Sequence, residues 1–411
     1  MKINKHCFPN GLRLVHHEDT STQMVALNIV YDVGARDEHP EHTGFAHLFE
    51  HLMFGGSAHI PDYDTPLQLA GGENNAWTNN DITNYYLTVP KTNVETAFWL
   101  ESDRMLELTF SEQGIEVQRG VVMEEFKQRC LNQPYGDIGH LFRPLAFRVH
   151  PYRWPTIGKE LSHIEQATLD EVKSFFYRFY APNNAVLAVT GNISWDETVK
   201  LTEKWFAPIP RRDVPVRQLP QEPEQTQERR LMVERNVPLD ALFMGYHMCS
   251  REGADYYAFD ILSDILSNGR SSRLNRRLVQ EQNIFSGIDA YISGTRDAGL
   301  LQISGKPAAG VSLEQAEAAV RRELEELRQS PVSAQELEKV KNKFESTQIF
   351  GNINYLNVAT NLAWFELTGK AEDIDLEVER YRSVTTEQLH TVAQRAFCEN
   401  NTVVLYYKSD K

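Results

Sequence analysis

Residues 168–191, TLDEVKSFFYRFYAPNNAVLAVTG, align without gaps with residues 385–408, TTEQLHTVAQRAFCENNTVVLYYK. The identities pair Thr168, Arg178, Asn183, Asn184 and Val186 with Thr385, Arg395, Asn400, Asn401 and Val403. Each copy has the pattern of a Thr-capped amphipathic helix, an Asn-Asn turn and an apolar strand. The alignment therefore predicts that one structural unit occurs twice in the chain.

The order of the preceding elements supports this repeat. Strand patterns at 25–36 and 240–251 are each followed by a helical pattern, at 44–54 and 255–267. A second strand and helix then follow in both halves, at 85–90 with 93–108 and at 299–304 with 312–329. The sequence predicts an α+β fold of two homologous domains, each a mostly antiparallel sheet packed with helices.

A proline-rich segment separates the two halves. Prolines stand at 208, 210, 215, 220 and 223, and this density excludes helix and sheet interior. We predict a first domain at 1–208, a linker at 209–229 and a second, homologous domain at 230–411.

Composition excludes several classes of protein. The formal net charge of −15 disfavours nucleic acid as a partner, because phosphate binding relies on clustered Lys and Arg. No apolar stretch is long enough to span a membrane. The start of the sequence lacks the apolar core of a signal peptide, so we predict a cytoplasmic protein.

The strongest candidate for a functional motif lies in residues 43–56, TGFAHLFEHLMFGG. In a helix with Thr43 as its predicted N-cap, His47 and His51 stand at i and i+4 and project from one face. That spacing suits two ligands of one tetrahedral zinc ion. Glu50 lies on nearly the same face and is placed to take a proton from water. H-x-x-E-H is the inverted form of the zincin motif.

A catalytic zinc needs a third protein ligand and an open position for water. A carboxylate on another helix would supply it, and the helical pattern at 111–129 carries both Glu124 and Glu125. The spacing alone leaves the choice between these two residues open.

The motifs together resemble the pitrilysin family, which includes insulin-degrading enzyme, mitochondrial processing peptidase and bacterial zinc peptidases of this size. HLFEH is followed 74 residues later by the second Glu of VVMEE, where the family has its third ligand. The resemblance extends through NNAWTNNDITNYY (74–86), HPYRWPTIG (150–158), FYAPNNAVLAVTG (179–191) and NGRSSRL (268–274). It covers nearly the whole chain and implies that Glu125 is the third ligand.

The resemblance implies a zinc metallopeptidase with one Zn²⁺ per chain, held in the N-terminal domain alone. In the second half, Phe259 and Ser263 fall where His47 and His51 stand. Glu50 would be the general base that activates water for hydrolysis of the peptide bond.

Family members seat the substrate along an edge strand by β-augmentation. The corresponding residues here are Asn75, Ala76, Trp77 and Thr78. In the family, two chains of this size close into a hollow shell, which implies that unfolded peptides are the substrates.

Two positions depart from the family pattern. Gln118 replaces a Glu that supports the site seven residues before the third ligand, and it keeps hydrogen-bonding capacity without charge. An Arg and a Tyr that grip substrate in the second half are replaced by Val279 and Ser286, while Arg277 and Tyr291 are out of register.

The missing Arg/Tyr pair favours one kind of partner. We predict a dimer with a homologous chain that lacks zinc and carries the pair, with a homodimer as the other arrangement. The alternative function is that of a non-catalytic structural or assembly subunit. Such subunits tend to lose H-x-x-E-H, which this chain keeps.

Overall fold

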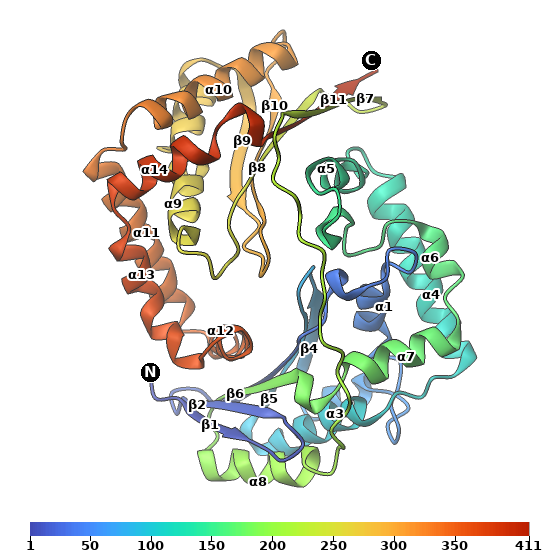
Figure 1. The fold of residues 1–411 in the computed structure, drawn as a ribbon. Coiled ribbons are helices and arrows are strands. Elements are labelled where there is room, and N and C mark those ends of the chain that lie inside the picture. Colours follow the sequence, from blue (N-terminus) through green and yellow to red (C-terminus); the bar gives the residue numbers. More distant parts are fainter. Residues whose placement is uncertain (411) are drawn as a thin grey trace. The chain divides into compact units, whose positions relative to one another are not determined.

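A computed structural model describes residues 1–410, which form two compact units (Figure 1). Unit 1 contains Met1–Arg129, Trp154–Pro220 and Ile349–Leu376. Unit 2 contains Cys130–Arg153, Gln221–Gln348 and the residues from Glu377 onward.

Unit 1 is built on a six-stranded sheet of order β1-β2-β6-β3-β5-β4. Its strands are β1 (Asn4–Cys7), β2 (Arg13–Glu18), β3 (Met24–Tyr31), β4 (Glu73–Thr78), β5 (Thr83–Pro90) and β6 (Ala185–Gly191). Only β2 and β6 pair in parallel. Because β4 is the last strand in this order, one of its edges is left without a partner strand.

Unit 2 is built on a five-stranded sheet of order β7-β11-β8-β10-β9. Its strands are β7 (Arg229–Arg235), β8 (Ala241–His247), β9 (Phe285–Ile292), β10 (Leu300–Pro307) and β11 (Thr402–Ser409). The one parallel pair is β7 with β11. This order repeats β2-β6-β3-β5-β4 of unit 1, strand for strand, so the predicted fold class of two related, mostly antiparallel α+β units is confirmed.

Each segment predicted to be helical contains a helix, and the structure has further helices that were not predicted. Unit 1 has α1 (Phe45–Leu52), α2 (Asp64–Leu69), α3 (Val94–Leu106), α4 (Glu112–Phe126), α6 (Leu161–Glu165), α7 (Leu169–Phe179), α8 (Trp195–Phe206) and α12 (Tyr355–Thr368). Unit 2 has α5 (Ile138–Ala146), α9 (Tyr256–Ser267), α10 (Leu313–Gln329), α11 (Ala334–Gly351, up to Gln348), α13 (Glu377–Ser383) and α14 (Thr386–Ala396). The repeated helix-turn-strand segments are α7 with β6 and α14 with β11.

Both faces of the unit 1 sheet are covered. Leu27 and Ile29 of β3 face the core beneath α1, α3 and α7, whereas Ala26 and Val30 face a second core. That second core is made with α12, a helix from the C-terminal half of the sequence. A strand that is buried on both faces is expected to be mostly apolar, and β3 (MVALNIVY) fits this expectation except at the buried Asn28.

Unit 2 receives a helix from the N-terminal half in the same way. Phe142 and Ala146 of α5 pack on the sheet against Leu405 and Tyr407 of β11. Gly245 makes this approach possible, because a Cβ there would lie 2.8 Å from the Phe142 ring. The compact units therefore exchange helices between the two halves of the sequence, while the division into domains at 1–208 and 230–411 stays a prediction.

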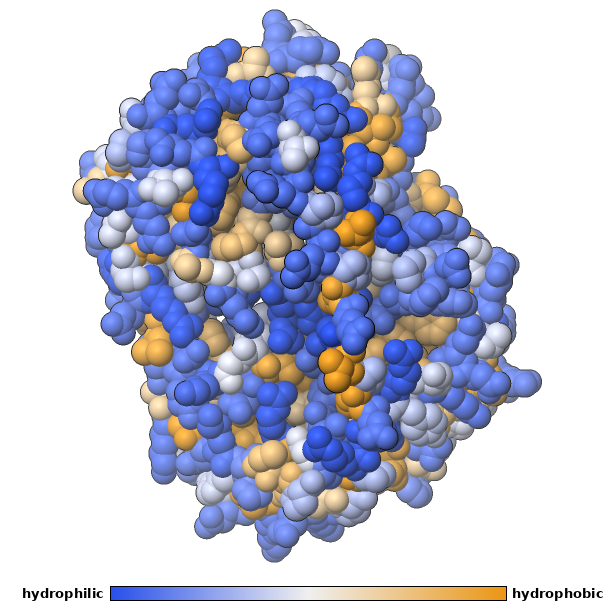
Figure 2. All heavy atoms as spheres, viewed as in Figure 1, coloured by the Kyte–Doolittle hydropathy of each residue, from blue (hydrophilic) through white to orange (hydrophobic). Residues whose placement is uncertain are grey.

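The segment between α8 and β7 forms neither helix nor strand, as its proline density indicates. Within residues 1–410, no helix is long and apolar enough to cross a membrane. On the face shown in Figure 2, hydrophobic residues are interspersed among hydrophilic ones.

Candidate functional site

Helix α1 sets the positions of the predicted His and Glu residues. Leu48 and Phe49 are buried in the unit 1 core, which leaves the opposite face of the helix turned away from the core. On that face the rings of His47 and His51 lie with centroids 4.9 Å apart and planes at 84°. Helical geometry alone therefore brings the two imidazoles together, as the i and i+4 spacing predicted.

The start of α1 is held by a residue that the sequence did not single out. Glu38 is buried, and its carboxylate accepts hydrogen bonds from the backbone N–H groups of Gly44 and Ala46, each at 2.9 Å. The predicted N-cap, Thr43, was wrong by one residue, because α1 begins at Phe45 and its N-cap is Gly44, in the left-handed region (φ 91°). Thr43 instead accepts a hydrogen bond from the backbone N–H of Lys159.

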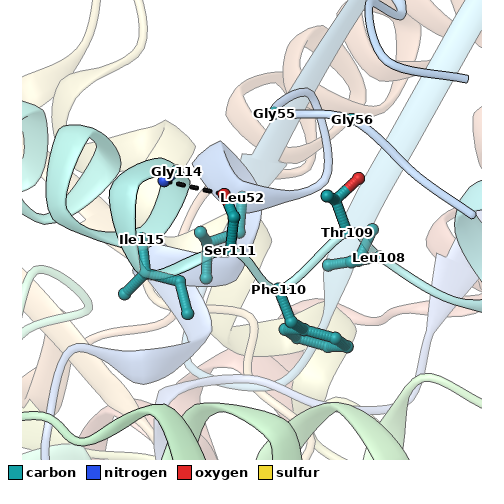
Figure 3. Close-up of a pocket in the computed structure, with 9 residues that line it drawn as sticks. All are labelled: Leu52, Gly55, Gly56, Leu108, Thr109, Phe110, Ser111, Gly114 and Ile115. Atoms are coloured by element: carbon teal, nitrogen blue, oxygen red, sulfur yellow. Dashed lines mark hydrogen bonds between the residues drawn. The ribbon is translucent and has the colours of Figure 1, made fainter.

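Helix α4 brings the carboxylate to the two imidazoles. Its N-cap is Ser111, whose Oγ accepts a hydrogen bond from the N–H of Gly114 at 3.0 Å. Figure 3 shows this first turn beside the end of α1, where Leu52 and Ile115 line a small pocket. Because α4 starts here and runs along α1, Glu125 near its end reaches the His face.

One oxygen of Glu125 faces both histidines. Its Oε2 lies 3.5 Å from Nε2 of His47 and 3.3 Å from Nε2 of His51. Ligand atoms of a tetrahedral zinc with bonds of about 2.0–2.1 Å are separated by about 3.3–3.4 Å. The three side chains thus present one ligand atom each at spacings that fit a single small metal ion.

The charge states of these groups follow from their surroundings. Burial, opposed by the carboxylate of Glu125, lowers the pKa of His47 to about 4, so this imidazole is neutral at pH 7 and able to act as a ligand. Its Nδ1 is buried and makes no hydrogen bond within residues 1–410. Burial also raises the pKa of Glu50, as suits a group that accepts a proton during catalysis.

The predicted substrate-binding residues lie along the open edge of the sheet on β4. Ala76 packs toward the core beneath α1, whereas Trp77 packs toward the core made with α12. The Ala76 N–H donates a hydrogen bond to the side-chain oxygen of Asn75 at 2.8 Å. The Thr78 hydroxyl lies near Glu50 and favours its charged form. Among residues 1–410 this hydroxyl is buried and makes no well-formed hydrogen bond, so its effect on the pKa of Glu50 comes from its closeness to the Glu50 carboxyl.

Comparison with known proteins identifies the family. Residues 13–135 match the family model described as insulinase (peptidase family M16), and residues 166–344 match the one described as peptidase M16 inactive domain. The chain belongs to the M16 peptidase family. The predicted pitrilysin-family resemblance is therefore confirmed.

The relatives of this M16 chain are named as zinc proteases. It is 26% identical to the zinc protease PqqE of Helicobacter pylori, over 97% of this chain and 91% of that protein. It is 24% identical to the uncharacterized zinc protease YmxG of Bacillus subtilis, over 98% of each. Among solved structures, a protease from Helicobacter pylori superimposes with a TM-score of 0.93 at 26% identity, covering 99% of each chain.

Two other predicted residues of the M16 site lie outside the three-ligand cluster. Gln118 lies beside Gly55 at the end of α1 and makes no hydrogen bond to His47, His51 or Glu125. The predicted role of Gln118 in supporting the site is therefore not accompanied by a hydrogen bond to any of these three side chains. The rejected ligand candidate, Glu124, is exposed and pairs with Lys127 at 3.8 Å.

Sequence reasoning missed two residues around this site of the M16 chain, Arg129 and Glu38. Arg129 lies 2.8 Å from Glu125, through its Nη1 and the carboxylate Oε1. The i and i+4 spacing of an acidic and a basic residue was the signal that could have found it. Glu38 carried no comparable signal, because its contact with α1 is made from an irregular segment.

The second half of the M16 chain lacks the corresponding groups. Phe259 and Ser263 of α9 are buried, and Phe259 is part of the unit 2 core. Val279 packs against that core, and Ser286 donates a hydrogen bond to the carbonyl of Lys306. Arg277 is paired with Glu323 and Glu326, so its side chain is engaged in an ion-pair network. Among residues 1–410, only His47, His51 and Glu125 form a group that could hold a metal ion.

The buried carboxyl of Glu38 predicts a pH dependence of stability. Burial raises its pKa to about 8 in the folded protein, above its usual value in the unfolded chain. The folded state therefore binds more protons between the two values, so stability is lost as pH rises toward about 8. Glu38→Gln should remove the part of the pH dependence of stability that comes from this carboxyl group. The urea midpoint of wild type should fall from pH 5 to pH 8 by an amount equivalent to more than about 1 kcal/mol beyond the fall in the variant.

The exposed Glu41 provides a matched control on the same segment. Glu41→Gln should retain the wild-type pH dependence. Identical pH profiles for wild type and Glu38→Gln would contradict the assignment of this part of the pH dependence to Glu38.

Proposed function

We propose that this M16 chain is a zinc metalloendopeptidase that hydrolyses unfolded peptides, with zinc held by His47, His51 and Glu125. The observation that carries the proposal is that Oε2 of Glu125 lies 3.5 and 3.3 Å from the Nε2 atoms of His47 and His51, with all three ligand atoms within 4.8 Å of one another. The donor set fits a catalytic zinc site, which has three nitrogen or oxygen ligands from the protein and one open position. The zinc-protease names of the relatives agree with this set.

Glu50 has the position and environment of a general base. When bound, zinc polarises a substrate carbonyl and lowers the pKa of water to about 7. Glu50 stands between the ligand pair on α1 and the edge strand β4, because it precedes His51 and lies near Thr78. From there its carboxylate accepts a proton from the attacking water and returns it to the leaving amine.

Strand β4 offers the surface along which a peptide could be held. An extended substrate added to the open edge would pair with backbone groups such as the Ala76 N–H, after displacing the Asn75 side chain that now bonds to it. Since Thr78 of the same strand lies near Glu50, such a peptide would pass close to the base. Main-chain pairing also explains why folded proteins would be excluded, because their backbone groups are already paired.

The ligand set predicts the outcome of metal analysis. Wild type should contain about one zinc per chain, and His47→Ala, His51→Ala and Glu125→Ala should each lose it, because three protein ligands are needed. Metal content after dialysis against a weak chelator is the measurement, with circular dichroism to verify the fold.

Glu124→Ala is the matched control for Glu125→Ala, since it removes the neighbouring exposed carboxylate of the same helix. It should leave the zinc content unchanged. Full zinc in Glu125→Ala together with loss in Glu124→Ala would show that the third ligand is the other glutamate.

The alternative function is that of a non-catalytic structural subunit. The match to the family model described as peptidase M16 inactive domain does not favour this alternative. That match covers residues 166–344, which contain none of His47, Glu50, His51 and Glu125. An inactive second half beside a half with a complete ligand set is the arrangement that the proposal requires.

The second half predicts that a partner supplies the substrate grip. Val279 packs against the unit 2 core and Ser286 is a short side chain bonded to a backbone carbonyl, so neither can hold a peptide in reactive geometry. We therefore include in the proposal a closed chamber formed with a homologous, zinc-lacking chain that carries Arg and Tyr at these positions.

Adding that sister chain should raise peptidase turnover by at least about tenfold, because orientation contributes several kcal/mol to catalysis. The measurement is cleavage of an unstructured peptide by the zinc chain alone and after mixing. Full activity of the isolated chain, unchanged by the partner, would favour a homodimer instead.

A further inference from the structure

The two oxygens of the Glu125 carboxylate have different partners. Oε2 faces the two imidazoles, at 3.3 and 3.5 Å. Oε1 lies 2.8 Å from Nη1 of Arg129, one turn further along the chain. The Glu125 side chain is only 18% exposed, so its orientation is set by these contacts rather than by solvent.

The backbone changes between the two residues. Helix α4 ends at Phe126 and continues as a π-helical turn over Lys127–Leu131. Single π turns are frequent at functional sites. Here the turn carries Arg129, whose guanidinium reaches back to the ligand carboxylate.

We propose that Arg129 is a positioning residue that holds Glu125 as a one-oxygen ligand. A free carboxylate can bind a metal through one oxygen or through both. A guanidinium on Oε1 ties up that oxygen and leaves Oε2 directed at the site. The metal would then keep three protein ligands and an open position for water, which is the arrangement that a catalytic zinc needs.

The alternative explanation is an ordinary surface ion pair. The Arg129 side chain is 67% exposed, and exposed pairs contribute little to stability. A surface pair and a positioning residue differ in one respect that can be measured. Loss of a surface pair leaves the coordination of the metal unchanged, whereas loss of the positioning residue frees Oε1 to bind as well.

Cobalt(II) in place of zinc reports this difference, because its visible absorption depends on the number and geometry of the ligands. Purified full-length wild type, Arg129→Met and Arg129→Lys would be stripped of metal and titrated with Co²⁺. Arg129→Met removes the guanidinium and keeps a long side chain. Lys127→Met is the matched control, since it removes a cation of the same turn that pairs with Glu124 instead.

Wild type and Lys127→Met should give the intense visible bands of four-coordinate cobalt. Arg129→Met should bind one Co²⁺ per chain with bands weaker by about twofold, because the second oxygen of Glu125 joins the coordination. Arg129→Lys should be intermediate, since an ammonium ion lacks the fixed fork of a guanidinium.

A wild-type spectrum in Arg129→Met would overturn the positioning role and leave an ordinary ion pair. This inference rests on the proposed metal site, and the two can fail separately. Absence of Co²⁺ and Zn²⁺ binding by wild type would overturn the proposed function itself, whatever the variants do.

Discussion

Glu50→Gln should retain about one zinc per chain and lose peptide hydrolysis by about a thousandfold. The substitution removes the proton acceptor from α1 but none of the three side chains whose ligand atoms lie within 4.8 Å of one another. Gln has nearly the same shape, so the buried surroundings of this position should be preserved. Metal analysis and turnover of an unstructured peptide, measured on the same preparation with the sister chain present, would test both parts.

Glu124→Gln makes the same chemical change on an exposed carboxylate of α4 and should leave hydrolysis unchanged. Loss of zinc together with activity in Glu50→Gln would mean that Glu50 contributes to metal binding. Near-normal turnover with zinc retained would contradict its role as the base.

The largest effect on stability is expected from a buried ion pair behind α1. Arg104 is fully buried, and its Nε and Nη2 bond to the two oxygens of Glu101 at 3.1 and 2.5 Å. The guanidinium also lies 4.6 Å from the ring centres of Tyr63 and Tyr85. Since the Tyr85 hydroxyl bonds to the Phe49 carbonyl of α1, this cluster supports the helix that carries the ligand pair.

Glu101→Leu should destabilise unit 1 by about 3–5 kcal/mol, because it leaves a buried cation without its counter-ion. The double variant Glu101→Leu/Arg104→Met should recover most of this loss, since an apolar pair of similar volume has no charge to desolvate. A single variant that stays within about 1 kcal/mol of wild type would contradict this account.

Tryptophan fluorescence in a urea titration would follow unit 1 alone. All six tryptophans lie in its ranges, at Trp77, Trp99, Trp154, Trp195, Trp205 and Trp364. The unfolding of unit 1 can therefore be separated from that of unit 2 in the intact chain.

Local periodicity was enough to predict many of the strands and helices and the part of the site that lies on α1. Strand and helix patterns located β3, β5, β6 and their counterparts in the second half, because a period of 2 or 3.6 is a property of neighbouring residues. In the same way, the i and i+4 spacing was enough to place His47 and His51 on one face, with Glu50 beside them.

The third ligand marks the limit of that reasoning. The sequence offered both Glu124 and Glu125, and only the family resemblance chose between them. In the structure the choice follows from the packing of α4 beside α1, which directs Glu125 at the imidazoles and leaves Glu124 in solvent. Periodicity gives the face of one helix but not its rotation against another.

Only the tertiary structure decided which helices cover which sheet. The sequences of α12 and α5 did not indicate that α12 packs on the unit 1 sheet and α5 on the unit 2 sheet. An apolar stripe on a helix shows that this face is buried but not which surface covers it. The sequence by itself determined that an α+β unit occurs twice and that one copy carries H-x-x-E-H. Tertiary packing decided where Glu125 points and that Glu38 caps α1, because both depend on how separate segments are turned toward each other, which spacing along the chain does not record.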